Sequence, residues 1–148
     1  IKKPSSPIAS YIDNDAFKLY FFDVGILCAM LDVPARILID DIKIFTEFKG
    51  VLMEQFVLQE LKNIGLNPLY WASNTAEIDF ITEIEGDVIP LEVKAGINLK
   101  AKSLASYINK YNPNKVARSS LADFKMTFPI YDIPLYMISE YQKILGYV

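Results

Sequence analysis

The chain of 148 residues contains no histidine and a single cysteine. Without histidine there is no serine–histidine or cysteine–histidine catalysis, no histidine general base and no histidine-ligated zinc site. A metal ion bound here would need oxygen ligands, which favours Mg²⁺ or Mn²⁺. One cysteine cannot form an internal disulfide framework, and this usage is typical of a reducing cytoplasm.

Several other sequence signals are missing. No apolar run reaches the roughly 18 residues of a membrane-spanning helix, and the start lacks the basic and then apolar order of a secretory signal. No glycine-rich phosphate loop of the Walker type occurs, so we expect no ATPase activity from this segment itself. The net charge of −3 and a pI near 5.0 disfavour a broadly basic nucleic-acid surface but are compatible with a local groove. We expect a cytoplasmic domain without a membrane segment.

The residues that are present favour one α/β domain. Apolar residues make up 52% of the chain and the mean hydropathy is +0.22, as in a folded protein. Proline and serine near the start predict a linker over residues 1–15, followed by a single domain over residues 16–148. Hydrophobic periodicity predicts a strand-like aromatic run at 17–22, helices at 24–31, 50–64 and 99–110, strands at 66–73 and 115–119, a hairpin at 75–96 and a final apolar element at 130–138.

Individual residues mark the ends of these elements. Asp23 is placed to cap the helix at 24–31, and Asn98 is placed to cap the helix at 99–110. Pro134 interrupts the final apolar element, because proline cannot donate a ladder hydrogen bond. We therefore expect this last element to lie away from the centre of the sheet.

The helix at 50–64 carries one acid in an unusual position. Its expected polar stripe consists of Gln55, Gln59 and Lys62. Glu54 instead lies at the edge of the buried arc, where a carboxylate is costly unless it is paired or bound to a metal ion. The alternative is a boundary residue whose carboxylate reaches water.

The hairpin at 75–96 has a predictable register. Period-two alternation on both sides of residues 85–86 indicates a two-residue turn, which pairs Ile84 with Asp87. A three-residue loop would put Glu92 on the same face as Phe80, so we reject it.

This register gathers charged side chains on one face of the hairpin. It opposes Asp79 to Glu92, and Glu77 to Lys94. Opposed carboxylates repel each other, and a divalent cation between them is a common reason to keep such a pair. The alternative is an exposed sheet face with one Glu77–Lys94 salt bridge.

The order of these elements and acids resembles the core of the PD-(D/E)XK nucleases. In that comparison Glu54 is the helix acid, Asp79 is the acid of the second strand, and residues 92–94 form the Glu-x-Lys of the third strand. Three phrases, KLYFFDVGIL, GVLMEQFVLQEL, and EIDF followed by LEVKAG, are similar to a domain of unknown function found C-terminal to a P-loop ATPase module in bacterial and archaeal AAA-type ATPases. The resemblance covers residues 16–148, nearly the whole chain.

The resemblance implies a restriction-endonuclease-like fold, in which helices flank a mixed central sheet. It also implies that an ATPase domain precedes Ile1, which would explain why the sequence does not begin with methionine. The ligands implied for one Mg²⁺ or Mn²⁺ ion are Asp79, Glu92, Glu54 and the carbonyl of Val93. With Asp79, Glu92 and Lys94 as catalytic residues, the site would activate water for attack on a phosphodiester of DNA. Glu77 is an additional acid that pairs with Lys94 or supports a second ion.

Three readings of the site stay open from the sequence. The first is a metal-dependent nuclease, and the second is a non-catalytic module that docks DNA or a protein and regulates the ATPase. The third is a structural carboxylate cluster without a ligand. Metal binding would separate the first reading from the other two. A basic patch near Lys94, Lys100 and Lys102 would favour DNA over a protein partner.

Overall fold

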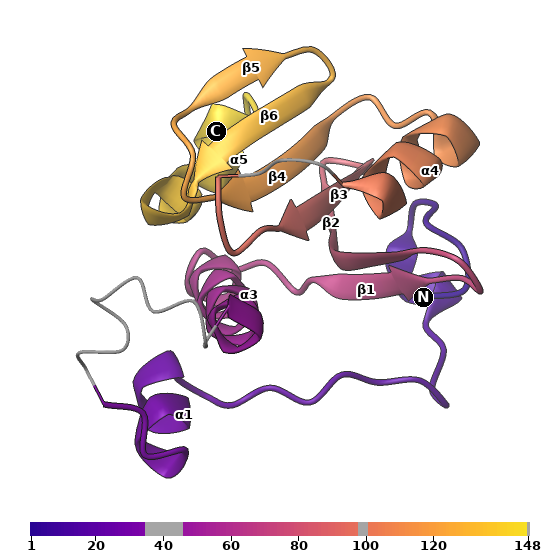
Figure 1. Cartoon of the computed structure of the whole chain (residues 1–148). Helices are drawn as coiled ribbons and strands as arrows, with labels where there is room; N and C mark the ends of the chain where they lie inside the picture. The colour runs from indigo at the N-terminus through magenta and orange to yellow at the C-terminus, as the bar shows by residue number, and fades with distance from the viewer. Residues whose placement is uncertain (35–45, 98–100, 148) are drawn as a thin grey trace.

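The computed structural model describes residues 1–34, 46–97 and 101–147. Six strands form one mixed sheet in the order β1-β2-β3-β4-β6-β5 (Figure 1). The strands are β1 Leu69–Ala72, β2 Glu77–Ile84, β3 Asp87–Val93, β4 Val116–Ser120, β5 Lys125–Thr127 and β6 Ile130–Pro134. The helical elements are η1 Ile8–Tyr11, α1 Val24–Met30, α3 Thr46–Asn63, α4 Lys102–Tyr111, η3 Leu135–Glu140 and α5 Tyr141–Ile144. The expected α/β class with a mixed sheet and flanking helices is confirmed.

Helical elements cover both faces of the sheet (Figure 1). On one face, Val57 and Leu61 of α3 pack with Leu91, Ala117 and other sheet residues, together with η3 and α5. On the other face, α4 and η1 pack against a second cluster that includes Val116. Because Val116 and Ala117 are neighbours in one strand, their side chains point to opposite faces, and the two clusters therefore lie on either side of the sheet.

The hairpin has the predicted register. β2 and β3 pair antiparallel from Ile84–Asp87 to Phe80–Leu91. The two turn residues both have positive φ, at 51° for Glu85 and 85° for Gly86, as a type I′ turn requires. The sequence prediction of a two-residue loop is confirmed.

The β1–β2 pairing contains an irregularity that the sequence did not reveal. Leu69 pairs with Ile81 and Trp71 pairs with Ile78, so β2 advances three residues while β1 advances two. In a regular strand, side chains three positions apart point to opposite faces of the sheet. Because of the irregularity, Ile78 and Ile81 contribute to the same hydrophobic cluster. The extra residue is a β-bulge at Asp79–Phe80, and such bulges reorient side chains next to functional sites.

The segment before α1 is extended but does not join the sheet. Residues 17–22, expected as a strand-like run, are instead fixed to α3 by Gln55, whose amide donates to the Phe21 carbonyl and accepts from the Phe21 N–H. Gln59 similarly accepts from the Val24 N–H. The predicted polar stripe of α3 is therefore wrong for both glutamines, because their partners are backbone groups of a segment more than 30 residues away.

Other boundaries follow from local chemistry. Asp23 caps α1 as predicted, since its Oδ1 accepts from the N–H groups of Gly25 and Ile26. Asn98 and Lys100 lie outside the described residues, and α4 begins at Lys102.

β6 is the fifth of the six strands, so it lies away from the centre of the sheet, as expected. It is paired on both sides, with β4 and with the edge strand β5. Its pairing with β4 ends at Pro134. Because Pro134 is the last residue of the strand, its missing N–H does not interrupt the ladder. The short edge strand β5 and helix α5 were not predicted.

The first residues pack on the sheet. Ile8 is buried in the cluster below α4, and its N–H donates to Glu83 at 2.9 Å. The linker expected over residues 1–15 is thus part of the packed structure in its central portion. Among the described residues, no helix is both long enough and apolar enough to cross a membrane.

Candidate metal-binding site

Asp79 lies at the bulge of β2, directly beyond the last β2–β3 ladder pair. Its Oδ2 accepts a hydrogen bond of 2.7 Å from the backbone N–H of Val93 at the end of β3. Val93 pairs on its other side with Ser119 of β4. The carboxylate is therefore fixed where the antiparallel hairpin gives way to the parallel part of the sheet.

The environment of Asp79 disfavours its charged form. Burial is the main cause, repulsion from Glu92 comes next, and Glu54 adds to it. The hydrogen bond from Val93 and the positive charge of Lys18 act in the opposite direction but are weaker, and the pKa of Asp79 rises to about 7. A carboxylate with such a pKa, held by a specific charge environment, is a candidate functional group.

Glu92 is the most deeply buried acid of the predicted set, with 5% of its surface exposed. Its Oε1 accepts from Lys94 Nζ at 2.6 Å. Its Oε2 is buried and has no hydrogen-bond partner among the described residues. Buried carboxylate oxygens are normally paired, so this oxygen needs an explanation such as a bound ion or water.

A second ion pair lies in line with Glu92 across the sheet. Glu92 is in register with Arg118 of β4, and Arg118 is in register with Asp132 of β6. Arg118 Nε and one of its terminal nitrogens both lie 2.6 Å from Asp132 Oδ1. The guanidinium thus adds a partly buried positive charge on the β4 side of Glu92.

Glu54 and Glu77 are held together by Lys18 of the segment before α1. Lys18 Nζ lies 3.0 Å from Glu54 Oε1 and 2.6 Å from Glu77 Oε1. Burial alone would lower the pKa of Lys18, but the hydrogen bonds to Glu77 and Glu54 outweigh it and raise the pKa overall. The hydroxyl of Tyr20 also donates to Glu54 Oε1, and burial together with this bond raises the pKa of Tyr20.

The predicted Glu77–Lys94 pair is not formed. Glu77 pairs with Lys18, and Lys94 pairs with Glu92. The reason is that the regular β2–β3 ladder ends at Phe80–Leu91, before it reaches either residue. Lys18 and Tyr20 were missed as site residues, although their spacing of two in an extended segment puts both side chains on one side.

The predicted residues therefore divide into two connected groups. Asp79, Glu92 and Lys94 lie just beyond the end of the β2–β3 ladder, at a place that we call the hairpin fork. Glu54 and Glu77 both pair with Lys18. Asp79 connects the two groups, because it interacts electrostatically with both Glu92 and Glu54. Within the described ranges, no group of three or more His, Cys, Asp or Glu residues is arranged so that it could hold a metal ion. Lys94 is engaged by Glu92, and the part of the chain with Lys100 is not described, so the expected basic patch stays untested.

Two carboxylates are nevertheless a sufficient protein contribution for some ions. Mg²⁺ commonly takes one or two carboxylates from the protein and completes its shell with water and substrate oxygens. Asp79 and Glu92 supply oxygen donors and repel each other, and Glu92 offers a buried oxygen that has no hydrogen-bond partner in the described part of the chain. The donor chemistry thus fits Mg²⁺ or Mn²⁺ at the hairpin fork.

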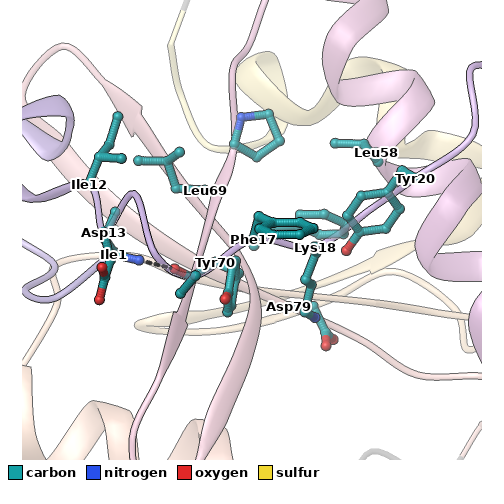
Figure 2. A pocket seen from close by; sticks show the side chains of 13 residues that line it. Ile1, Ile12, Asp13, Phe17, Lys18, Tyr20, Leu58, Leu69, Tyr70 and Asp79 are labelled. Carbon is teal, nitrogen blue, oxygen red and sulfur yellow. Dashed lines mark hydrogen bonds between the residues drawn. The ribbon is translucent and has the colours of Figure 1, made fainter.

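A pocket of about 260 Å³ adjoins this fork. Figure 2 shows its lining, which comes from the segment before α1, from β1, from β2 and from Leu58 of α3. Asp79 and Lys18 supply charged groups, and Phe17, Tyr20 and Tyr70 supply aromatic rings. A ligand in this pocket would touch one of the two fork carboxylates.

Comparison with known families matches residues 49–136 to the domain of unknown function DUF4143. The match covers more than half of the chain and includes every site residue predicted from the sequence, but not Lys18 or Tyr20. No curated protein and no solved structure matches the chain. The chain therefore belongs to the family of the domain of unknown function DUF4143.

Proposed function

We propose that this domain binds one Mg²⁺ or Mn²⁺ ion through Asp79 and Glu92 and hydrolyses phosphodiester bonds of DNA, as a PD-(D/E)XK-like module of an AAA-type ATPase. The observation that carries the proposal is the buried Glu92 Oε2, which has no hydrogen-bond partner among the described residues and lies near a second carboxylate. A cation between these acids would remove their repulsion and satisfy the oxygen.

Charge balance supports a cation at the fork. Four carboxylates, those of Glu54, Glu77, Asp79 and Glu92, interact with one another or with the ammonium groups of Lys18 and Lys94. Two positive charges leave a net charge of −2 when all four acids are ionised. Burial is the main cause of the raised pKa of Asp79, and repulsion from Glu92 and Glu54 adds to it. A divalent ion would balance the excess negative charge.

The protein groups have distinct roles in this proposal. Val93 orients Asp79 through its N–H, and Lys94 orients Glu92 through its ammonium group. A bound magnesium ion would supply Lewis-acid stabilisation of the phosphate and lower the pKa of a coordinated water. Lys94 would also face the phosphate, where its positive charge stabilises developing negative charge.

The acidic site also explains why affinity for DNA would depend on the metal ion. Phosphate binding normally relies on unpaired lysine and arginine, whereas Lys18 and Lys94 are both paired with carboxylates. Without a divalent ion the site would repel a phosphodiester. We therefore expect both binding and cleavage of DNA to require Mg²⁺ or Mn²⁺.

The test is a titration of Mg²⁺ and Mn²⁺ followed by calorimetry and by thermal unfolding. The parent should bind the ion saturably and gain about 2.7 kcal/mol of stability at 100 times the dissociation constant. Asp79→Asn and Glu92→Gln keep side-chain size and should lose this gain. Glu60→Gln, at an acid of α3 outside the site, is the matched control and should bind like the parent.

The activity arm uses single- and double-stranded DNA with the same proteins. Metal-dependent cleavage that is lost in Asp79→Asn and Lys94→Met, but not in Glu60→Gln, would support hydrolysis. Saturable metal binding without cleavage would leave the ion site in place and reject the nuclease activity. Absence of binding by the parent at millimolar metal and DNA would reject both parts of the proposal.

A second candidate function rests on exposed apolar side chains near α1. Leu19 is 86% exposed and Phe22 is 93% exposed, and Ile26 and Met30 of α1 are also exposed. Contiguous exposed apolar residues commonly mark protein interfaces. We propose as the alternative a docking role, in which residues 19–30 contact the ATPase module and regulate it.

This alternative makes a separate prediction. Leu19→Glu and Phe22→Glu should weaken association with the ATPase module in the longer protein, while metal binding by the domain stays unchanged. Lys62→Gln, at the end of α3, also changes the net charge by −1 and is the charge-matched control. Unchanged association in both apolar variants would exclude this surface as the docking site.

A further inference from the structure

The pocket beside Asp79 combines aromatic rings with charged groups at one end. Phe17 is 82% exposed at the pocket, so its ring is accessible to a ligand. Tyr70 of β1 lines the same pocket, and Lys18 Nζ lies 5.4 Å from the centre of its ring. Figure 2 shows Phe17, Tyr70, Lys18 and Asp79 toward the same end of the pocket.

We propose that this pocket receives an unpaired nucleobase of a single-stranded nucleic acid, stacked on Phe17 and Tyr70, with the adjoining phosphodiester at Asp79. The inference rests on the proposed function, which it extends from DNA in general to a single-stranded substrate. It assigns a binding role to Phe17 and Tyr70, neither of which belongs to the acid–lysine set of the hairpin fork.

The chemistry of the lining favours a base over an aliphatic side chain of a peptide. A base has a flat face that stacks on aromatic rings and an edge that accepts hydrogen bonds. The Lys18 ammonium has three donors and uses two of them on Glu54 and Glu77, so one donor is left for a ligand in the pocket. A purely aliphatic ligand would make no hydrogen bond with this donor.

The position of the pocket also favours a single strand. Asp79 lines the pocket and belongs to the hairpin fork, so a base in the pocket and a phosphate at the fork would be neighbours in one nucleotide. In a duplex each base is stacked and paired, and extruding it costs a few kcal/mol. An unpaired base avoids this cost.

The test uses a single-stranded DNA oligonucleotide with a central 2-aminopurine, whose emission falls when the base stacks on an aromatic ring. Binding is measured in Ca²⁺, which is expected to occupy the site without supporting cleavage, and again in EDTA. The parent should quench the emission, and an equimolar duplex of the same sequence should not compete. Phe17→Ala and Tyr70→Leu should each weaken binding by about 5- to 100-fold, and Phe17→Trp should restore it.

The matched control is Phe22→Ala, an exposed aromatic residue of the same segment that does not line the pocket. It should bind like the parent. Because Phe17 is largely exposed, its substitution should leave thermal unfolding unchanged, which separates lost binding from lost folding.

The outcomes distinguish the pocket from the metal site. Quenching that depends on Phe17 but not on Asp79 or Ca²⁺ would support the base pocket and count against the ion site. Binding that depends on Asp79 and Ca²⁺ but not on Phe17 would overturn the base pocket alone. Equal competition by the duplex, or no binding of the single strand in either buffer, would also overturn it and leave an apolar peptide side chain as the fitting occupant.

Discussion

The backbone N–H of Val93 donates a 2.7 Å hydrogen bond to Asp79 Oδ2, immediately after the β2–β3 ladder ends at Phe80–Leu91. The bond follows the last β2–β3 ladder pair and fixes a carboxylate beside the end of β3, where β3 still pairs with the parallel strand β4 on its other side. The same carboxylate is buried and close to Glu92, which raises its pKa to about 7. Asp79 is thus held in a fixed position while its surroundings disfavour its charged form, as at many functional sites.

The first prediction concerns the dependence of stability on pH. Because the pKa of Asp79 rises from 3.8 when unfolded to about 7 when folded, the folded state holds more protons between these values. The stabilising contribution of Asp79 is therefore complete below about pH 4 and is lost as the pH rises through 7. Asp79→Asn keeps an acceptor for Val93 and should raise the free energy of unfolding at pH 8 by about 1–3 kcal/mol.

Urea denaturation at pH 4, 6 and 8 measures this effect, and the gain should shrink toward zero at pH 4. Asp87→Asn is the control with the opposite sign. Hydrogen bonds from Tyr147 and Asn114 lower the pKa of Asp87, so its contribution is present above pH 4 and is lost as the pH falls. If Asp79→Asn is less stable than the parent at pH 8, the carboxylate is structurally required and the proposed charge conflict is wrong.

The second prediction concerns the pair formed by Lys94 and Glu92. Lys94→Met would leave a carboxylate that is 5% exposed without its ammonium partner. Removing one member of a buried ion pair is costly, and we expect a loss of about 2–4 kcal/mol at pH 7. Adding Glu92→Gln to this variant should recover most of the loss, because a neutral amide needs no counter-charge.

A cycle of four proteins, the parent, the two single variants and the double variant, isolates the coupling in urea denaturation. Lys143→Met is a control lysine, since it pairs with Glu140 at the surface and should change stability little. A Lys94→Met variant as stable as the parent would show that another cation, such as Arg118, compensates Glu92.

The sequence was informative where the signal is local. The hairpin register follows from alternation on two adjacent strands and from the turn at residues 85–86, and the structure confirms it down to Phe80–Leu91. The helix around Glu54 and the N-cap at Asp23 also follow from short-range patterns. In each case the residues that determine the feature lie within a few positions of it.

The sequence was uninformative where a distant segment decides the geometry. The bulge at Asp79 exists because of how β2 pairs with β1, and no period in β2 alone reveals it. Gln55 resembles a solvent-facing residue, yet it is 2% exposed because it binds the backbone of Phe21, 34 positions earlier. Lys18 likewise pairs with Glu54 and Glu77, which lie far from it in the sequence. Which carboxylate pairs with which lysine therefore could not be predicted from spacing.

The third prediction concerns how Gln55 holds the segment that carries Lys18. Its side chain makes two hydrogen bonds to Phe21, of 2.9 Å and 2.8 Å. Gln55→Leu removes both, and the segment should open locally without global unfolding. Loss of about 1–2 kcal/mol of local stability predicts roughly 5- to 30-fold faster trypsin cleavage after Lys18.

The matched measurement is the cleavage rate after Lys110 in α4, which should not change in the same variant. Glu60→Gln, at an α3 residue that does not bind the segment, should leave both rates like those of the parent. Equal cleavage after Lys18 in the parent and in Gln55→Leu would mean that other contacts of residues 17–22 hold the segment.

The last prediction concerns Lys18 as a competitor of the metal ion. Its ammonium group lies between Glu54 and Glu77, and its charge also acts on Asp79. Lys18→Gln makes the acid group more negative by one charge. With an effective dielectric constant of about 40 and a charge separation of roughly 8 Å, a divalent ion at Asp79 would gain about 2 kcal/mol. Relaxation and salt reduce this gain, and we expect Mg²⁺ to bind about 5- to 10-fold more tightly.

Calorimetric titration of Mg²⁺ into the parent, Lys18→Gln and Lys62→Gln measures this change. Lys62 contacts Asn67 at the C-terminal end of α3, so Lys62→Gln should leave the affinity for Mg²⁺ unchanged. This variant controls for the loss of one lysine charge elsewhere in the domain. Weaker Mg²⁺ binding in Lys18→Gln would show that the lysine organises the acids for the ion rather than competing with it. Tighter binding specific to Lys18→Gln would mean that the positive charge of Lys18 lowers the affinity of the hairpin fork for the cation.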